Sequence, residues 1–259
     1  MLFPRIIPCL LIKDKGLVKT VKFKDGKYVG DPINAVRIFN EKEADELVVL
    51  EIDTTVKEKE PDYQMIENLA CECRMPMCYG GGVKLAQQAS KIFSLGVEKI
   101  ALSSSIVKHP YVIQEIASEV GSQSVVAILD VKKKLFGGYQ IYTHNATEKT
   151  KLDLLKFIEE IEALGVGEIV INSIDHDGMM QGYDFDLVNM VHQHTRVPVT
   201  VLGGAGSLDD VGKLIAKYPI IGAACGSLFV FKGKYKAVLI NYPNYQEKEQ
   251  LVHHNITSI

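Results

Sequence analysis

Two glycine-rich turns in this 259-residue sequence carry residue types suited to binding phosphate. Gly80-Gly81-Gly82 and Gly203-Gly204-Ala205-Gly206 each follow an apolar run and precede a helical pattern, and the next apolar runs end in Ser103-Ser104-Ser105 and Gly226-Ser227. Such turns expose backbone N–H groups, and the positive end of a helix dipole adds to their attraction for anions. A glycine turn alone can also be a tight turn that binds nothing. We predict phosphate binding by Gly81, Gly82, Ser103, Ser104, Gly203, Gly204, Gly226 and Ser227.

The second glycine turn repeats the first at a nearly constant spacing. Gly203 lies 123 residues after Gly80, and Ser227 lies 122 residues after Ser105. Two further pairs of similar segments, 45–53 with 167–175 and 9–13 with 128–132, occur in the same order. Four matched pairs in one order indicate a chain made of two similar halves.

The elements that would position these turns are those of a (β/α)8 barrel, in which phosphate-binding turns follow the late strands. The length suits one such barrel, and hydrophobic residues make up 47% of the chain, which is ample for a core. We predict an α/β fold, a TIM barrel of two (β/α)4 halves at about residues 1–120 and 121–241. A polar tail at 242–259 should be loose from residue 245 onward.

Apolar runs and turn signals set the expected element boundaries. Strands are expected at 5–12, 46–52, 75–79, 99–104, 124–131, 168–174, 198–202 and 220–225. Helices are expected from Pro32 after the cap Asp31, at 61–73 and 84–95, from Pro110, from Thr147 or Lys149, after Ser207, and at 232–240.

Long insertions follow the first and fifth expected strands. Residues 17–29 alternate about the turn Lys24-Asp25-Gly26, and residues 134–142 surround Gly137-Gly138, so both segments are typical of β-hairpins. Insertions at the C-terminal end of barrel strands carry the active-site loops. We therefore expect these two hairpins to close over a substrate.

Composition limits the partners and the location of the chain. The net charge is −3 and no basic helix face recurs, which argues against nucleic-acid binding. The apolar N-terminus is short and broken by prolines and an arginine, so we expect no signal peptide and no membrane span. The five cysteines predict reduced core residues of a cytoplasmic protein. Cys71, Cys73 and Cys78 lack the further ligands of a zinc site, and we predict no metal and no cofactor.

Several motifs together resemble the HisF family, the cyclase subunit of imidazole glycerol phosphate synthase. The resemblance covers about residues 3–232 and implies a two-half barrel that acts on a phosphorylated small molecule. It also implies a HisH-like glutaminase partner on the N-terminal face, which supplies ammonia, and it adds Gly178 to the predicted phosphate-binding residues. The motifs are Arg5-Ile-Ile-Pro-Cys-Leu, Gly30-Asp-Pro, Ala44-Asp-Glu-Leu, Gly80-Gly-Gly, Gly165-Val-Gly-Glu-Ile, Ser173-Ile-Asp-His-Asp-Gly, Gly182-Tyr-Asp and Gly203-Gly-Ala-Gly.

The resemblance implies catalytic roles for Asp130, Lys19 and Asp177. Asp130 stands at the C-terminal end of an expected strand, where barrel enzymes place catalytic groups, although it could merely hydrogen-bond a nearby loop. The family's second catalytic aspartate falls on Leu11, which cannot transfer a proton. Loss of one acid or base typically costs about 10²- to 10⁴-fold in rate. Asp53 or Asp177 is the alternative source of a second carboxylate.

Four charged residues stand at the starts of expected strands and should meet at the N-terminal end of the barrel. They are Arg5, Glu46, Lys99 and Glu168. Charges at this end of a barrel usually serve stability. The resemblance instead implies an ammonia gate that faces the glutaminase.

The sequence keeps the four charges of the ammonia entrance but has Leu11 in place of an aspartate. In this combination it is most similar to one branch of the family, the HisF-type acetamidino modification proteins of surface-polysaccharide synthesis. These act with a glutaminase and an ATP-dependent amidotransferase, and residues 226–243 also resemble that branch. The leading hypothesis is a barrel subunit that delivers ammonia to a phosphorylated or nucleotide-linked sugar. The alternatives are an authentic cyclase of histidine biosynthesis and a barrel without catalysis that only channels ammonia.

Overall fold

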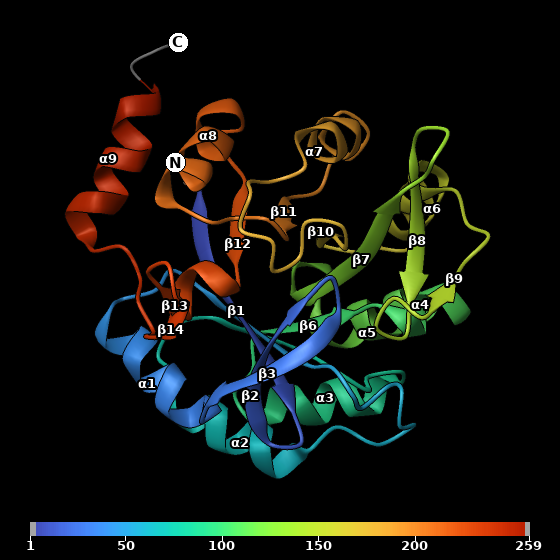
Figure 1. The fold of residues 1–259 in the computed structure, drawn as a ribbon. Helices are drawn as coiled ribbons and strands as arrows, with labels where there is room; N and C mark the ends of the chain where they lie inside the picture. Colours follow the sequence, from blue (N-terminus) through green and yellow to red (C-terminus); the bar gives the residue numbers. More distant parts are fainter. Residues whose placement is uncertain (1–3, 257–259) are drawn as a thin grey trace.

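The structure, a computed structural model, describes residues 4–256, with side chains described up to residue 251. Eight parallel strands pair in sequence, and the pairing of the fifth with the sixth completes a closed barrel, so the predicted (β/α)8 fold is confirmed (Figure 1). The barrel strands are β1 (Arg5–Lys13), β4 (Leu47–Glu51), β5 (Met77–Gly80), β6 (Lys99–Leu102), β7 (Val125–Lys133), β10 (Glu168–Ser173), β11 (Val199–Leu202) and β12 (Gly222–Cys225).

Helices connect the strands and lie around the outside of the barrel (Figure 1). The predicted start of the first helix is confirmed, because Asp31 accepts a hydrogen bond from the Asn34 backbone N–H at 2.8 Å and Pro32 takes the first helical position. The helices are α1 (Pro32–Glu41), α2 (Tyr63–Glu72), α3 (Ala86–Ser94), α4 (Ser104–Lys108), α5 (Val112–Val120), α6 (Leu154–Ala163), α7 (Phe185–His192) and α8 (Leu208–Lys217), with 3₁₀ turns η1 (Ser122–Ser124) and η2 (Ser227–Phe229).

Side chains alternate between two hydrophobic cores, as the pleat of a strand requires. On β1, Ile6 and Leu10 face the helices, whereas Ile7 and Cys9 face the interior of the barrel. The interior is filled by small and branched apolar side chains, so it is a packed core. Its buried members are Ile7, Cys9, Val48, Cys78, Ala101, Val126, Ile128, Val170, Leu202 and Ala224.

The two halves of the barrel match in their element order. Strands β1, β4, β5 and β6 are followed by α4, and strands β7, β10, β11 and β12 are followed by η2. Each half therefore ends in a short helical turn directly after its fourth barrel strand. The repeated glycine turns and serines lie at equivalent places in these halves.

The two hairpins form, but the turn of the first differs from its prediction. Strands β2 (Gly16–Val21) and β3 (Lys24–Gly30) reverse at Lys22-Phe23, with φ of +50° and +62°, rather than at Asp25-Gly26. The loop around Asp177 fixes this turn, because the Lys22 N–H donates to the Asp177 carbonyl at 2.9 Å. In the second hairpin, β7 pairs with β8 (Tyr139–Thr143) as predicted.

Two other predicted helices differ from the structure. The fifth helix was expected at Thr147 or Lys149, but β9 (Glu148–Lys149) pairs with β8 there, and α6 begins after its cap Asp153. Residues 232–240 form a hairpin, β13 (Phe231–Lys232) with β14 (Ala237–Val238), because Gly233 and Lys236 adopt positive φ and turn the chain. Within residues 4–256, no helix is long and apolar enough to cross a membrane.

The polar tail was expected to be loose, and this was wrong for most of it. Residues Tyr245–Ile256 form helix α9, which packs beside α8 (Figure 1). Lys248 binds Asp45 at 2.9 Å and Leu251 packs against the core, so both a polar and an apolar contact hold this mostly polar helix. The last predicted loose residues, 257–259, lie outside the described part of the chain.

Candidate active site

We call the end of the barrel at which the strands have their C-termini the mouth. A cavity of about 260 Å³ lies there. It is lined by both glycine turns, by strand ends from both halves and by the β2–β3 hairpin. The structure therefore places all residues predicted to bind phosphate or to act in catalysis around one space. These are Leu11, Lys19, Asp130 and Asp177, together with Gly81, Gly82, Ser103, Ser104, Gly178, Gly203, Gly204, Gly226 and Ser227.

The glycine turn of the first half requires glycine by its geometry. Gly81 has φ of +139°, and a Cβ at this residue would lie 2.7 Å from the Glu51 carbonyl oxygen. Ser103 occupies the N-cap position of α4 without a capping hydrogen bond from its side chain, and the Ser104 Oγ accepts a hydrogen bond from the His144 N–H at 3.4 Å. The turn and the serines thus present small groups to the cavity, which suits close approach by an anion.

The turn of the second half is equally crowded and adds a cation. Gly204 has φ of +120°, and a Cβ there would clash with the Gly182 carbonyl oxygen. At the end of β12, a Cβ on Gly226 would lie 2.9 Å from the Lys19 Nζ. The Lys19 ammonium is therefore next to the strand end predicted to hold phosphate, where its charge favours an anion.

Asp130 is a half-buried carboxylate at the mouth, on the strand β7. Its Oδ1 accepts a hydrogen bond from the Asn172 Nδ2 at 2.9 Å. Burial raises the pKa of Asp130 to about 7; the hydrogen bonds from Asn172 and Ser103 lower it, and the charge of Asp177 raises it. A carboxyl group with this pKa exchanges protons near neutral pH, as a general acid or base must.

Lys19 and Asp177 hold the first hairpin against the mouth. Lys19 is buried, its Nζ donates to the Cys9 carbonyl at 2.5 Å, and burial lowers its pKa. Asp177 Oδ2 accepts from the Thr20 Oγ1 at 3.0 Å and from the Phe23 N–H at 3.4 Å. Both residues line the cavity, so each can contact a ligand as well as position the hairpin.

The place of the missing aspartate is apolar. Leu11 and Leu50 pack against the interior core and line the cavity. Of the two candidates for a second carboxylate, Asp53 forms an ion pair with Lys57 at 2.7 Å. Asp177 instead contributes to the raised pKa of Asp130, so these two carboxylates interact electrostatically. The charge of Asp177 thus acts on Asp130, whereas Asp53 is paired with Lys57.

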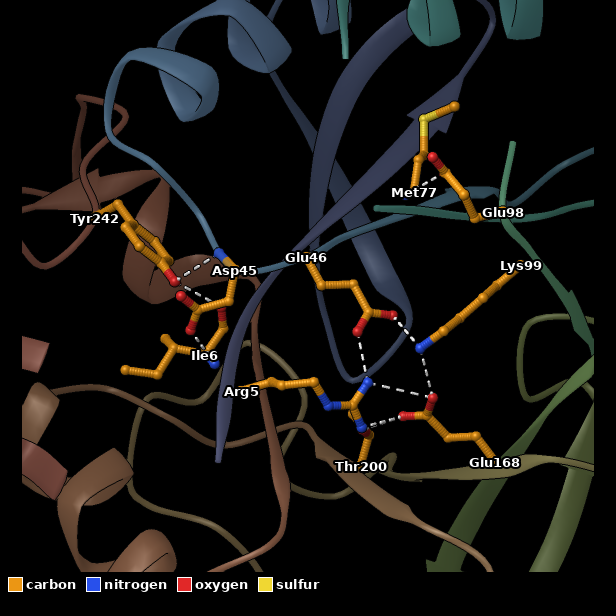
Figure 2. A network of polar contacts seen from close by, with 10 residues as sticks. All are labelled: Arg5, Ile6, Asp45, Glu46, Met77, Glu98, Lys99, Glu168, Thr200 and Tyr242. Atoms are coloured by element: carbon orange, nitrogen blue, oxygen red, sulfur yellow. Dashed lines mark hydrogen bonds and ion pairs between the residues drawn. The ribbon is translucent and has the colours of Figure 1, made fainter. Parts of the chain in front are cut away.

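The four charged residues at the strand starts meet in one network, which we call the floor (Figure 2). Arg5 binds Glu46 at 2.5 Å and Glu168 at 2.8 Å, and Lys99 binds the same two carboxylates at 2.7 and 2.9 Å. Burial disfavours the charge of Glu168, but the hydrogen bonds and charges of Arg5 and Lys99 hold its pKa below the ordinary value. Two cations thus balance two nearly buried anions.

Residues of the C-terminal segment form hydrogen bonds with the strand starts beside the floor. The Tyr242 hydroxyl donates to the Ile6 carbonyl at 2.8 Å and accepts from the Asp45 N–H at 3.1 Å (Figure 2). Asp45 in turn accepts from the Ile6 N–H at 2.9 Å and binds Lys248. These bonds link the starts of β1 and β4 to helix α9.

Two residues of the site were missed by the sequence analysis. Thr200 is fully buried at the floor and donates to Glu168 at 2.6 Å, while Asn172 orients Asp130 at the mouth. Asn172 Oδ1 is buried without a hydrogen-bond partner among the described residues. The signal available in the sequence was a polar residue inside each of two apolar strands, since an interior polar side chain needs a partner.

The fold and the site define a class of protein: a closed (β/α)8 barrel of two similar halves, with paired glycine turns at one end and a balanced charge network at the other. Residues 5–236 match the model of the family described as "Histidine biosynthesis protein". The chain belongs to this family, and within it to the HisF proteins.

Relatives of two degrees of similarity support this membership. A protein of Vibrio vulnificus (strain YJ016), provisionally named imidazole glycerol phosphate synthase subunit hisF3, is 57% identical over 251 residues, or 96% of each chain. A provisionally named HisF subunit of Leptospira borgpetersenii is 55% identical over 97% of this chain and 99% of its own. The imidazole glycerol phosphate synthase subunit HisF of Natranaerobius thermophilus is 36% identical over 93% and 96%.

Proposed function

We propose that this chain is the ammonia-receiving subunit of a glutaminase complex. Ammonia from a HisH-like glutaminase enters at the floor, crosses the barrel and is delivered at the mouth to a phosphorylated or nucleotide-linked sugar, in the acetamidino modification of a surface polysaccharide. The observation that carries the proposal is the complete floor network together with a mouth cavity that is lined by both Leu11 and Asp130.

The interior of the barrel supports passage of a neutral molecule. The interior core of the barrel includes apolar and thiol side chains, among them Ile7, Val48, Cys78 and Val126. An apolar lining disfavours an ammonium ion, because burying an unpaired charge is costly, but it tolerates small neutral ammonia. The charged floor would then have to open only slightly to admit it.

The mouth supports a phosphorylated ligand and limited acid–base chemistry. The two glycine turns and Lys19 suit anions, and Asp130 can exchange a proton near neutral pH. Leu11 cannot act as a second acid or base. Addition of ammonia followed by ring closure and loss of water needs more than one proton transfer, so the mouth is better suited to delivery than to cyclisation.

The names of the relatives are consistent with a divergent branch. Proteins at 51–57% identity carry provisional names as imidazole glycerol phosphate synthase subunits, whereas the HisF proteins at 34–36% carry unqualified ones. The chain is therefore closer to a group whose activity is named only provisionally.

A second candidate is the cyclase of histidine biosynthesis, and the interaction of Asp177 with Asp130 favours it as a substitute carboxylate pair. Steady-state turnover of the bisphosphorylated ribulosyl substrate with an ammonium salt is expected only of the cyclase. A third candidate, a barrel that only channels ammonia, predicts that Asp130→Asn leaves amidine formation unchanged.

The test of the leading proposal uses the glutaminase with this chain. The chain should stimulate glutamine hydrolysis and retain the ammonia against an external trapping enzyme, without turnover of the ribulosyl substrate. Arg5→Ala should release ammonia to the trap while the mouth still binds inorganic phosphate. Full cyclase turnover by the unaltered chain would refute the proposal.

A further inference from the structure

Two buried side-chain oxygens in the described chain have no hydrogen-bond partner, and both belong to residues that line the mouth cavity. They are the Ser105 Oγ and the Asn172 Oδ1. Ser105 follows β6 and Asn172 lies near the end of β10, so they stand on either side of β7, the strand that carries Asp130. A buried polar atom without a partner costs free energy, and at a ligand site this cost is removed when the ligand supplies the partner.

The two oxygens require different partners. The Ser105 hydroxyl can donate a hydrogen bond, so it can bind an oxygen of a phosphate group. The Asn172 Oδ1 can only accept, so it disfavours an anion and needs an N–H or O–H donor. Asp130 sets the direction of this amide, because an ionised carboxylate also only accepts and therefore takes the Nδ2, at 2.9 Å. The Oδ1 is left to face another group.

Gly203 leaves the Asn172 Oδ1 uncovered by a side chain. A Cβ at Gly203 would lie 3.0 Å from this oxygen, and the backbone there has φ of +90°, which glycine adopts without strain. Gly203 also lines the cavity. Because the oxygen itself is buried, only a small donor can reach it without moving the second glycine turn.

The register of the barrel places Asn172 on a line that begins at the floor. Alternate residues of β10 face the inside of the barrel: Glu168 in the floor network, Val170 in the interior core and Asn172 at the mouth. At about 3.3 Å per residue, Asn172 lies about 13 Å from Glu168 along the strand. Leu202, which pairs with Asn172 on β11, also belongs to the interior core. The Asn172 amide is therefore the first polar side chain above the floor on this inner face of β10.

We propose that the Asn172 Oδ1 is the acceptor that binds ammonia where it leaves the interior of the barrel. This inference rests on the proposed function and names the residue that orients the nitrogen nucleophile. Ammonia donates an N–H to the amide oxygen and keeps its lone pair free for attack on the substrate in the mouth. Asp130 holds the amide in this orientation through the Nδ2.

The arrangement separates the two ligands of the mouth by their hydrogen-bonding chemistry. The glycine turns, Lys19 and the Ser105 hydroxyl offer donors and positive charge, which suit the phosphate of the substrate. The Asn172 oxygen offers an acceptor, which suits ammonia. A sugar hydroxyl could donate to the same oxygen, but it is part of a much larger molecule and the oxygen is buried.

The test is a titration of the ¹⁵N-labelled chain with ammonium chloride at mildly alkaline pH, where Asp130 is ionised. The side-chain amide signal of Asn172, identified by its absence in Asn172→Leu, should shift with ammonium. It should not shift with tetramethylammonium chloride, which has no N–H to donate. Read at the Gly203 backbone N–H, Asn172→Leu should weaken ammonium binding about fivefold, whereas Asn172→Asp keeps an accepting oxygen and should not weaken it.

The matched control removes another amide that lines the cavity. Asn145 Nδ2 donates to the Ile52 carbonyl at 2.9 Å, and Asn145→Gly suits the φ of +55° at this residue. This variant should bind ammonium like the unaltered chain. If Asn172 only held Asp130 in place, its leucine and aspartate variants would disturb the Gly203 signal alike and neither would change ammonium binding.

Other results would overturn the assignment of Asn172. An Asn172 amide signal that ammonium leaves unmoved, or equal weakening by Asn172→Leu and Asn172→Asp, refutes it, while stimulation of the glutaminase would leave the proposed function intact. If glycerol phosphate shifts this signal and ammonium does not, the oxygen binds a ligand hydroxyl and the assignment is wrong. Ammonium binding at Asn172 without stimulation of the glutaminase would support the site and refute only the proposed function.

Discussion

Replacing Asp130 with asparagine should stabilise the ligand-free protein at alkaline pH. Burial raises the pKa of this carboxyl from 3.8 to about 7, so the folded state binds a proton that the unfolded state has already released. The protonated carboxyl group therefore adds to the free energy of unfolding at low pH, and this contribution is lost as the pH rises from about 4 to about 7. Asparagine keeps a similar shape and has no charge to desolvate.

The size of the effect follows from the shift. A change of about three pKa units, at 1.36 kcal/mol each, amounts to about 4 kcal/mol over the whole window. Between pH of about 5 and about 8, the loss in the free energy of unfolding is roughly two thirds of this total. Water in the cavity screens the charge of Asp130 and reduces the loss further. We expect the unaltered chain to lose about 2 kcal/mol more than Asp130→Asn between these two conditions.

Chemical denaturation of both proteins at the two pH values measures this difference. Groups that titrate in both proteins cancel in the comparison, and Asp186→Asn at an exposed carboxylate controls for the amide substitution itself. If the free energy of unfolding depends on pH equally in the unaltered chain and in Asp130→Asn, burial does not raise the pKa of this carboxyl group. The acid–base role assigned to it would then lose its physical basis.

Three further changes test the floor, the missing acid and the second glycine turn. Glu168→Gln leaves two floor cations with one carboxylate and should lower the free energy of unfolding by about 3 kcal/mol, measured by denaturation; a loss below experimental error would show that the network is solvated. Leu11→Asp should increase turnover of the bisphosphorylated ribulosyl substrate with ammonium by about 10²-fold or more, and no gain would mean that the other cyclase groups are also absent. Gly204→Ala forces a Cβ against the Gly182 carbonyl and should weaken binding of inorganic phosphate about tenfold, followed by calorimetry. Gly233→Ala, also at positive φ but in open space, is its control, and equal phosphate binding by both variants would contradict a role for the second turn.

The features that the sequence predicted correctly are those that its local pattern determines. Apolar runs, glycine turns and their repetition gave the eight strands, and the charges at the strand starts were brought together by the closure of the barrel. The Lys22-Phe23 turn was missed because a tertiary bond from Asp177 fixes it, overriding the local preference of Asp25-Gly26. Asn172 acquires its partner only once β7 and β10 pair in register.

Helix α9 escaped prediction for a related reason. Its sequence is mostly polar, so periodicity gives little sign of the face on which Leu251 packs against the core. Its position depends on Lys248 and on neighbouring α8, contacts that no local pattern reports. The second hairpin was recognised as a hairpin, but the exposure of Leu135 and Phe136, which do not line the cavity, could not be read from alternation alone.

The bond between Tyr242 and Ile6 joins residues 236 positions apart. The rim of the floor therefore forms only after distant segments have folded together, because β1 also pairs with β12. A glutaminase that recognises the assembled floor would bind the closed barrel and ignore chains in which β1 and β12 have not yet paired. Assembly of the complex would then act as a check on closure of the barrel.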